Sequence, residues 1–303
     1  MNLENIEIER KKRLKSFYIF LGIGLGIFLI SLILFIIFFN QEEVPLLPII
    51  GIFIGLIIIG IGVLTNKKGY DTYVKNNLEK IIMNDVFKDS KYTYVENNGI
   101  SFKEMNYSGV FANPDDFKTS DTIRSTYKTV EFVLSDYVFT RIVTTTDSKG
   151  NTTTHEYPYP GRFMSFHLER NFASGVAIIE RRNNPDVIHH NLYKEKVDFE
   201  SIDFNKKFCA TASDKTKAFY LIRPKEIMDL LDLEQTYKGN ISNIVVNNMV
   251  YFILADVSIE FHYSIFKSIN DTQMKDIRAY YELPLRIIDR LNLGNDKFNT
   301  NLE

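Results

Sequence analysis

The architecture is decided by the run FYIFLGIGLGIFLISLILFIIFF at residues 17–39 and the run VPLLPIIGIFIGLIIIGIGVL at residues 44–64. Neither run contains a charged side chain. At about 1.5 Å per residue, a helix of either length covers roughly 30 Å, the thickness of the hydrocarbon layer of a bilayer. Inside that layer only a helix satisfies its own backbone hydrogen bonds. The sequence therefore predicts a transmembrane helical hairpin over residues 17–64.

Two other interpretations of these runs are weaker. A pair of buried core helices is disfavoured because helices of globular proteins rarely stay apolar on every face for so long. A cleaved signal peptide is rejected because the first run is long, lacks a small-x-small cleavage site and is followed at once by a second run. Transporters and proton relays carry ionisable groups at membrane depth, and these runs carry none. We therefore expect an anchor, with a hairpin that oligomerises into a channel component as a weaker alternative.

The flanking charges predict the orientation of the hairpin. Residues 10–15 contain five Lys and Arg side chains, and Lys67 and Lys68 follow the second run. The connection Asn40-Gln41-Glu42-Glu43 has no positive charge. By the positive-inside rule, both termini are predicted in the cytoplasm and the acidic turn outside, in a cell-membrane protein with two spans.

Glycines offer a prediction of how the two helices meet. Gly22 with Gly26, and Gly51 with Gly55, form G-x-x-x-G steps that allow close backbone contact. In an antiparallel hairpin, Gly26 and Gly55 are expected at similar depth. Because glycine is common in membrane helices anyway, packing and mere composition both remain open explanations.

The other residues have an ordinary globular composition. Residues 1–16 are predicted as a basic cytoplasmic segment, and residues 65–303 as a cytoplasmic α+β domain with a mostly antiparallel sheet and a few helices. The break Asn183-Asn184-Pro185-Asp186 indicates a subdivision of this domain as an alternative to one undivided domain.

Periodicity and turn residues place the elements of this domain. Asp147 to Asn151 predicts a hairpin turn, Asn247-Asn248 a second one, and Asp214 a helix N-cap. Strands are predicted over residues 91–96, 126–134, 137–146, 152–157, 162–168, 175–181, 209–212, 241–246, 249–257 and 259–262. Helices are predicted over residues 70–87, 199–208 and 215–221, from Pro224 onward, and over 272–291 with Pro284 as a kink site.

Charge and cysteine content exclude several classes of protein. The net charge is −2, and Lys and Arg do not cluster into a stripe outside the segments that flank the membrane runs. A nucleic-acid partner is therefore not expected. The single cysteine, Cys209, excludes an intrachain disulfide. Cys209 lies between Phe208 and Ala210 in an apolar strand, so it is interpreted as a buried structural thiol and not as a nucleophile.

No residue is predicted to be catalytic, cofactor-binding or metal-ligating. The sequence has no H-E-x-x-H, G-x-S-x-G, phosphate-binding loop or dinucleotide-binding motif in the soluble part. The adjacent pair His189-His190 points in different directions in any regular structure, so no metal or cofactor is expected. Other side chains considered and set aside are His155, His167, His262, Asp115-Asp116, Glu195, Asp198 and Glu200.

Residues 197–233, VDFESIDFNKKFCATASDKTKAFYLIRPKEIMDLLDL, carry a resemblance to a known family. The pattern has Phe204 and Phe208 four residues apart, a short strand ending at Asp214, and helices around Ala218 and from Pro224. This resembles the bacterial proteins grouped as the domain-of-unknown-function family number 3137. The Gly161-Arg162-Phe163 strand and two N-terminal spans are also similar to that family. The resemblance implies an architecture and no activity.

Two functions compete at this point. The first is a membrane-tethered interaction or scaffolding module, in contact with the bilayer through residues 17–64 and with a membrane-associated protein, a peptide or a lipid head group through its soluble domain. The alternative is a membrane-associated enzyme whose site is assembled from scattered polar residues. The strong anchor and the lack of a catalytic motif favour the first.

Overall fold

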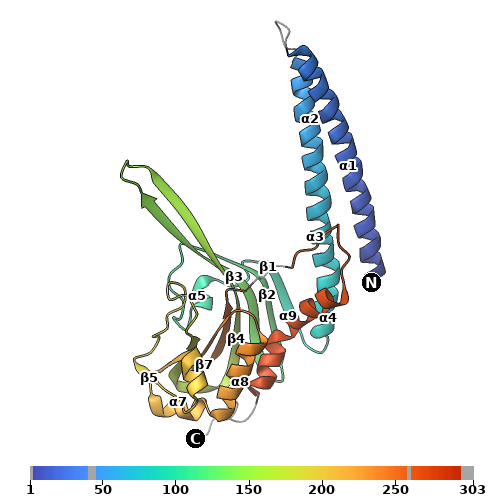
Figure 1. Cartoon of the computed structure of the whole chain (residues 1–303). Helices are drawn as coiled ribbons and strands as arrows, with labels where there is room; N and C mark the ends of the chain where they lie inside the picture. The colour runs from blue at the N-terminus through green and yellow to red at the C-terminus, as the bar shows by residue number, and fades with distance from the viewer. Residues whose placement is uncertain (1–2, 40–45, 258–260, 295–303) are drawn as a thin grey trace. The chain divides into compact units, whose positions relative to one another are not determined.

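The computed structural model describes residues 3–39, 46–257 and 261–294 (Figure 1). The fold is α+β, with two long apolar helices at the N-terminus and an antiparallel sheet with several helices in the rest of the chain. The chain divides into two units. The first consists of Met1–Val86 and Phe261–Tyr281, and the second of Phe87–Glu260 and Glu282–Glu303. The break at residues 183–186 lies inside the second unit.

The first unit contains the two helices of the predicted hairpin. α1 runs over Leu3–Phe38 and α2 over Leu46–Val63, and both are long and apolar enough to cross a membrane. In their most apolar windows only 11% and 17% of the residues are buried, so most of these side chains face outward. Their apolar character is therefore unexplained by packing within the described chain. The predicted acidic turn at residues 40–43 lies outside the described residues.

The helical chain continues well past the second apolar run. α2 passes without a break into a π-helical turn at Leu64–Lys68, and a second π-helical turn follows at Lys75–Glu79. The intervening and following segments are α3, Gly69–Val74, and α4, Lys80–Val86. The predicted helix over residues 70–87 is thus confirmed as part of one long helical stem.

The two helices meet at glycines, but not at the pair predicted. A Cβ atom on Gly24 would lie 2.8 Å from the carbonyl oxygen of Gly55. Gly22 and Gly26, by contrast, have no neighbouring atom within 4 Å of a Cβ. Residues two apart on a helix lie about 200° apart around its axis, so Gly24 faces α2 while Gly22 and Gly26 point away. The prediction was correct for Gly55 and wrong for Gly26.

The segment 261–281 completes the first unit by binding the stem. Glu79 is 6% exposed and accepts hydrogen bonds from the Tyr263 hydroxyl at 2.6 Å and the Tyr281 hydroxyl at 2.9 Å. The backbone N–H of Tyr263 donates to the Asp71 carboxylate at 3.1 Å. A buried carboxylate needs such donors, so these contacts fix the segment on the stem.

The second unit is built on a seven-stranded sheet in which all neighbouring pairs are antiparallel. The order is β1-β2-β3-β4-β6-β5, and β7 also pairs with β4. The bounds are β1 Tyr92–Asn97, β2 Asp116–Tyr127, β3 Val130–Thr146, β4 Thr152–Glu180, β5 Glu195–Val197, β6 Phe208–Ala212 and β7 Asn240–Ala255. The predicted turn at 147–151 is confirmed, since Thr146 pairs with Thr152 across it.

Several strand predictions are wrong in where the chain turns. The strands predicted at 152–157, 162–168 and 175–181 are one continuous strand, β4. Lys128 and Thr129 have φ of 46° and 68° and form the turn between β2 and β3, in the middle of the predicted strand 126–134. Asn247 has φ of 54° without turning the chain, so the predicted hairpin at 247–248 is one continuous strand with register shifts. The strand predicted at 259–262 is not formed at residues 261–262, and residues 258–260 lie outside the described part.

Several helices separate or follow the strands along the chain. Asp214 caps its helix by accepting from the backbone N–H of Lys217, and Pro224 occupies the first turn of the next, as predicted. The helices are α5 Phe102–Met105, α6 Ile202–Lys207, α7 Lys215–Leu221, α8 Pro224–Thr236 and α9 Asp271–Arg290. Pro284 lies inside α9, which passes from the first unit into the second.

Candidate functional site

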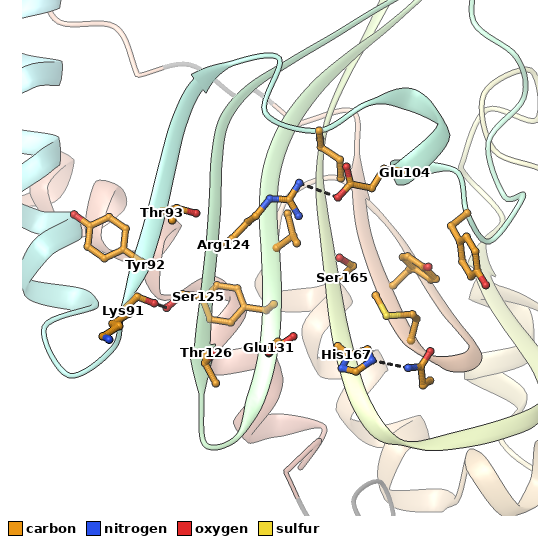
Figure 2. A pocket seen from close by; sticks show the side chains of 17 residues that line it. Lys91, Tyr92, Thr93, Glu104, Arg124, Ser125, Thr126, Glu131, Ser165 and His167 are labelled. Atoms are coloured by element: carbon orange, nitrogen blue, oxygen red, sulfur yellow. Dashed lines mark hydrogen bonds and ion pairs between the residues drawn. The ribbon is translucent and has the colours of Figure 1, made fainter.

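The sheet of the second unit carries a groove of about 670 Å³ on one face (Figure 2). Side chains alternate between the two faces of a strand, so the register of the sheet decides which ones reach the groove. The first transverse row follows the pairs Thr93↔Arg124↔Val133↔Ser165↔Tyr251. The second row follows Thr126↔Glu131↔His167↔Met249. All of these residues line the groove.

The row between them points to the opposite face. Phe132, Phe166 and Val250 are paired in register and are 3%, 0% and 1% exposed. On that face, side chains of α8, β7 and the segment after α9 surround a small apolar cavity. The two rows that line the groove are therefore separated by an apolar row that packs on the opposite face of the sheet.

One wall of the groove comes from the segment around α5. Met105 is fully buried in the core that also includes Ile100, Phe163 and Tyr251. This packing holds Glu104 over the sheet, where its carboxylate accepts from the Arg124 guanidinium at 2.8 Å. The same guanidinium donates to the carbonyl of Gly99 at 3.1 Å. Arg124 is thereby held upright between the sheet and the wall, as Figure 2 shows.

Charges of both signs line the groove. Lys91 and Arg124 are cationic, whereas Glu104 and Glu131 are anionic, so the formal charges balance. The Glu104 and Arg124 side chains remain 48% and 41% exposed and can reach a bound molecule. Apolar and aromatic side chains lie among these charges, and they include Ile100, Tyr107, Val133, Met249 and Tyr251.

His167 and Tyr251 are held in defined surroundings within the groove. The Asn248 amide lies 2.5 Å from Nε2 of His167, which suits an amide N–H donating to a neutral imidazole. Burial, and next the nearby Tyr107 and Tyr193, raise the pKa of the Tyr251 phenol far above its ordinary value. Tyr251 therefore stays protonated and acts as a neutral hydrogen-bonding and packing group.

Of the side chains that the sequence analysis considered and set aside, His167 lines this groove and the others do not. Cys209 is buried in β6 with its Sγ 3.7 Å from the His190 carbonyl, in agreement with a structural thiol. Asp115 accepts from the backbone of Ile142, and Glu195 from that of Lys215. Within the described ranges, no group of three or more His, Cys, Asp or Glu is placed to hold a metal ion.

No direct signal for the groove is present in the sequence. Its residues come from five strands and from α5, and the row through Arg124 and Ser165 exists only through cross-strand register. One indirect signal was present, because the polar Glu131 lies between the apolar Val130 and Phe132 in the predicted strand. That alternation identifies a strand with one face outside the core but does not name its neighbours.

Comparisons with known proteins give one family match and one distant structural similarity. No curated protein sequence matches the chain. Among solved structures, the crystal structure of the mycobacterial trehalose monomycolate transport factor A, TtfA, is similar with a TM-score of 0.38 and 8% identity, over 75% of this chain and 99% of that one. A similarity of this size does not establish a shared function. Residues 158–293 match the family described as "Protein of unknown function (DUF3137)". The resemblance found at residues 197–233 is therefore confirmed, because those residues lie within the range 158–293 that matches the model of the domain of unknown function number 3137.

Proposed function

We propose that this chain is a membrane-anchored interaction module, with residues 17–64 crossing the cell membrane twice and both termini in the cytoplasm. The outward-facing apolar helices support the crossing, because lipid is the solvent that such faces require. The basic residues 10–15, Lys67 and Lys68 support the orientation. The predicted division into residues 1–16, 17–64 and 65–303 is kept as part of this proposal.

The groove carries the functional part of the proposal. We infer that it binds an extended segment of a membrane-associated protein. Its charges are balanced between Lys91, Arg124, Glu104 and Glu131, and apolar side chains lie between them. An anionic lipid head group would favour an excess of positive charge, whereas a polypeptide offers apolar and charged side chains of both signs. A groove with a few well-placed polar groups on an apolar lining is the usual form of a binding site.

The enzyme alternative receives less support from this geometry. A general base must reach the proton that it abstracts, and a nucleophile needs such a base beside it. His167 is hydrogen-bonded to Asn248, and Arg124 to Glu104. These pairings fit a recognition surface better than a catalytic centre.

A photocrosslinking experiment tests the groove in the full chain in its own membrane. A benzophenone amino acid at Thr126, which is exposed in the second row, reports on groove occupants. The matched control position is Thr216 on α7, which is also exposed but lies outside the groove. We expect a discrete polypeptide adduct at Thr126 that Met249→Glu abolishes and that Thr216 does not form.

Two results would overturn the proposal. One is an adduct pattern at Thr126 that matches the Thr216 control or survives Met249→Glu. The other is an adduct that contains only lipid, which would replace the protein partner by a lipid ligand. Comparable chain levels in the membrane serve as the check that Met249→Glu still folds.

A further inference from the structure

We propose that the loop of residues 261–270 forms a third membrane contact, at the head groups of anionic phospholipids, with Phe266 as its apolar tip. This inference rests on the proposed membrane crossing of residues 17–64. It concerns a segment that lies about two hundred residues later in the chain. All the contacts that carry it belong to the first unit.

The loop is held in place by polar contacts with the two helices. Nη1 of Arg10 donates to the carbonyl of Ile265 at 2.7 Å, and Arg10 is itself paired with Glu7. The Tyr263 contacts with Asp71 and Glu79 fix the beginning of the loop. Since Ile265 is 1% exposed, the residue before the tip is locked into the unit.

Phe266 does not share that burial. It is 46% exposed, although it directly follows the buried Ile265. Its ring meets the ring of Phe17 edge-on, with centroids 5.4 Å apart. Phe17 is the first residue of the apolar run, so this contact places Phe266 at the boundary between the span and its basic flank. Aromatic side chains are enriched at this level of a membrane.

Positive charges surround the tip. Nζ of Lys67 lies 5.6 Å from the centre of the Phe266 ring, and Lys267 follows in the chain. Lys67, Lys68 and Lys267 are exposed, and among the described residues none of them is paired with a carboxylate. The nearby Glu7 and Glu9 are already paired with Arg10 and Arg13.

The chemistry of this surface fits a phospholipid and not a soluble anion. A phosphate group suits several lysines, and the half-exposed ring beside them suits the glycerol and upper acyl region of the same molecule. The surface also continues the apolar face of α1, which the proposed function already places in lipid. Anionic phospholipid is therefore the occupant that satisfies both halves of the surface.

Tryptophan fluorescence tests the contact directly, because the chain contains no Trp. Phe266→Trp in the full chain creates a single reporter at the tip. The protein is reconstituted in phosphatidylcholine vesicles with and without phosphatidylglycerol, using lipids brominated near the head group. Phe53→Trp, in the apolar run and 61% exposed, is the positive control, and Phe219→Trp, 43% exposed on α7, is the comparison outside the loop.

We expect the Phe266→Trp variant to emit at shorter wavelength than the Phe219→Trp variant. We also expect the brominated lipid to quench its fluorescence, more strongly when phosphatidylglycerol is present. Adding Lys67→Ala and Lys267→Ala to the Phe266→Trp variant should remove that gain, because the phosphate groups then lose their cationic partners.

Two results would count against the proposal in different ways. If the Phe53→Trp reporter is shielded in lipid but the Phe266→Trp reporter is neither shifted nor quenched, the loop contact is refuted while the membrane crossing stands. If lipid leaves the Phe53→Trp reporter unaffected, the crossing itself fails, and the loop contact fails with it. An unchanged gel-filtration volume in detergent confirms that each variant is folded.

Discussion

Replacing Gly24 by alanine should separate the two long helices. The added Cβ would lie 2.5 Å from Cγ1 of Ile59 and 2.8 Å from the carbonyl oxygen of Gly55. The isoleucine side chain can rotate, but the carbonyl belongs to the helix backbone. The helices must therefore move apart locally by roughly 0.6 Å to restore ordinary contact. Overpacking of this kind costs about 1–3 kcal/mol.

Thermal stability in detergent measures this loss. A destabilisation of 1 kcal/mol lowers the melting temperature by about 2–4 °C in chains of roughly this size, so Gly24→Ala should melt several degrees lower. Gly22→Ala and Gly26→Ala are matched controls in the same helix, because nothing lies within 4 Å of a Cβ at either position. The free energy of unfolding of these two variants should stay within about 0.5 kcal/mol of the wild-type value.

The opposite pattern would refute the packing. If Gly26→Ala or Gly22→Ala lowers the melting temperature while Gly24→Ala does not, α1 presents its other face to α2. Equal effects at all three positions would also contradict the structure, since they would indicate a general sensitivity to side-chain volume and not a specific contact.

Three further predictions concern buried contacts outside the apolar runs. Glu79→Gln replaces a carboxylate that accepts hydrogen bonds from two tyrosine hydroxyls, so it should destabilise the chain by about 1.5–3 kcal/mol in thermal melts. An unchanged melting temperature would contradict the role given to these two hydrogen bonds. The hydrogen bond from Arg10 lowers the pKa of Glu7, so this pair stabilises the loop above the ordinary carboxyl pKa of 4.5, and that stabilisation is lost as the pH falls below it. The protection factors of the amides at residues 263–267, corrected for the intrinsic exchange rate at each pH, should therefore fall below that pH and stay constant near pH 7, and constant protection throughout would contradict the pairing. Gly161→Ala would place a Cβ within 2.7 Å of the Tyr137 ring, and we expect a loss of about 1–3 kcal/mol, which an unaltered melting temperature would disprove.

The helical hairpin was predictable because its signal is local. Residues 17–39 and 44–64 are uniformly apolar, and no tertiary information is needed to find them. The contact between the helices was only half predictable. A G-x-x-x-G spacing says which glycines share a face, but the rotation of α1 that selects Gly24 over Gly26 depends on packing across both helices.

The sheet was predictable in kind but not in its turns. The turn at 147–151 was found because Asp147 and Gly150 are strong turn residues, and Asp147 indeed accepts backbone N–H groups from Lys149 and Asn151. The turn at Lys128-Thr129 was missed because neither residue is typical of a position with positive φ. At Asn247 the opposite error occurred, since asparagine tolerates that conformation in a bulge as well as in a turn.

The groove could not be predicted, because it is a product of register. Arg124 and Ser165 lie about forty residues apart in the chain and share a row only through two strand pairings. The long strand β4 pairs with β3, β6 and β7 and so fixes which residues share a row of the groove. No local sequence pattern predicts the length of this strand.

A two-span anchor that holds the domain inside the cell underlies both functional proposals, and cysteine labelling tests it. Cys209 is buried at 6% exposure, so single cysteines introduced elsewhere can be labelled selectively. Glu42→Cys marks the predicted outer turn, and Lys149→Cys marks the exposed hairpin turn of the domain. When a membrane-impermeant maleimide is added to cells whose cytoplasmic membrane is intact, we predict labelling of the Glu42→Cys variant and not of the Lys149→Cys variant. The Lys149→Cys variant should be labelled only after the membrane is permeabilised. Labelling of Lys149→Cys in intact cells would show that the domain lies outside and that the proposed topology is wrong.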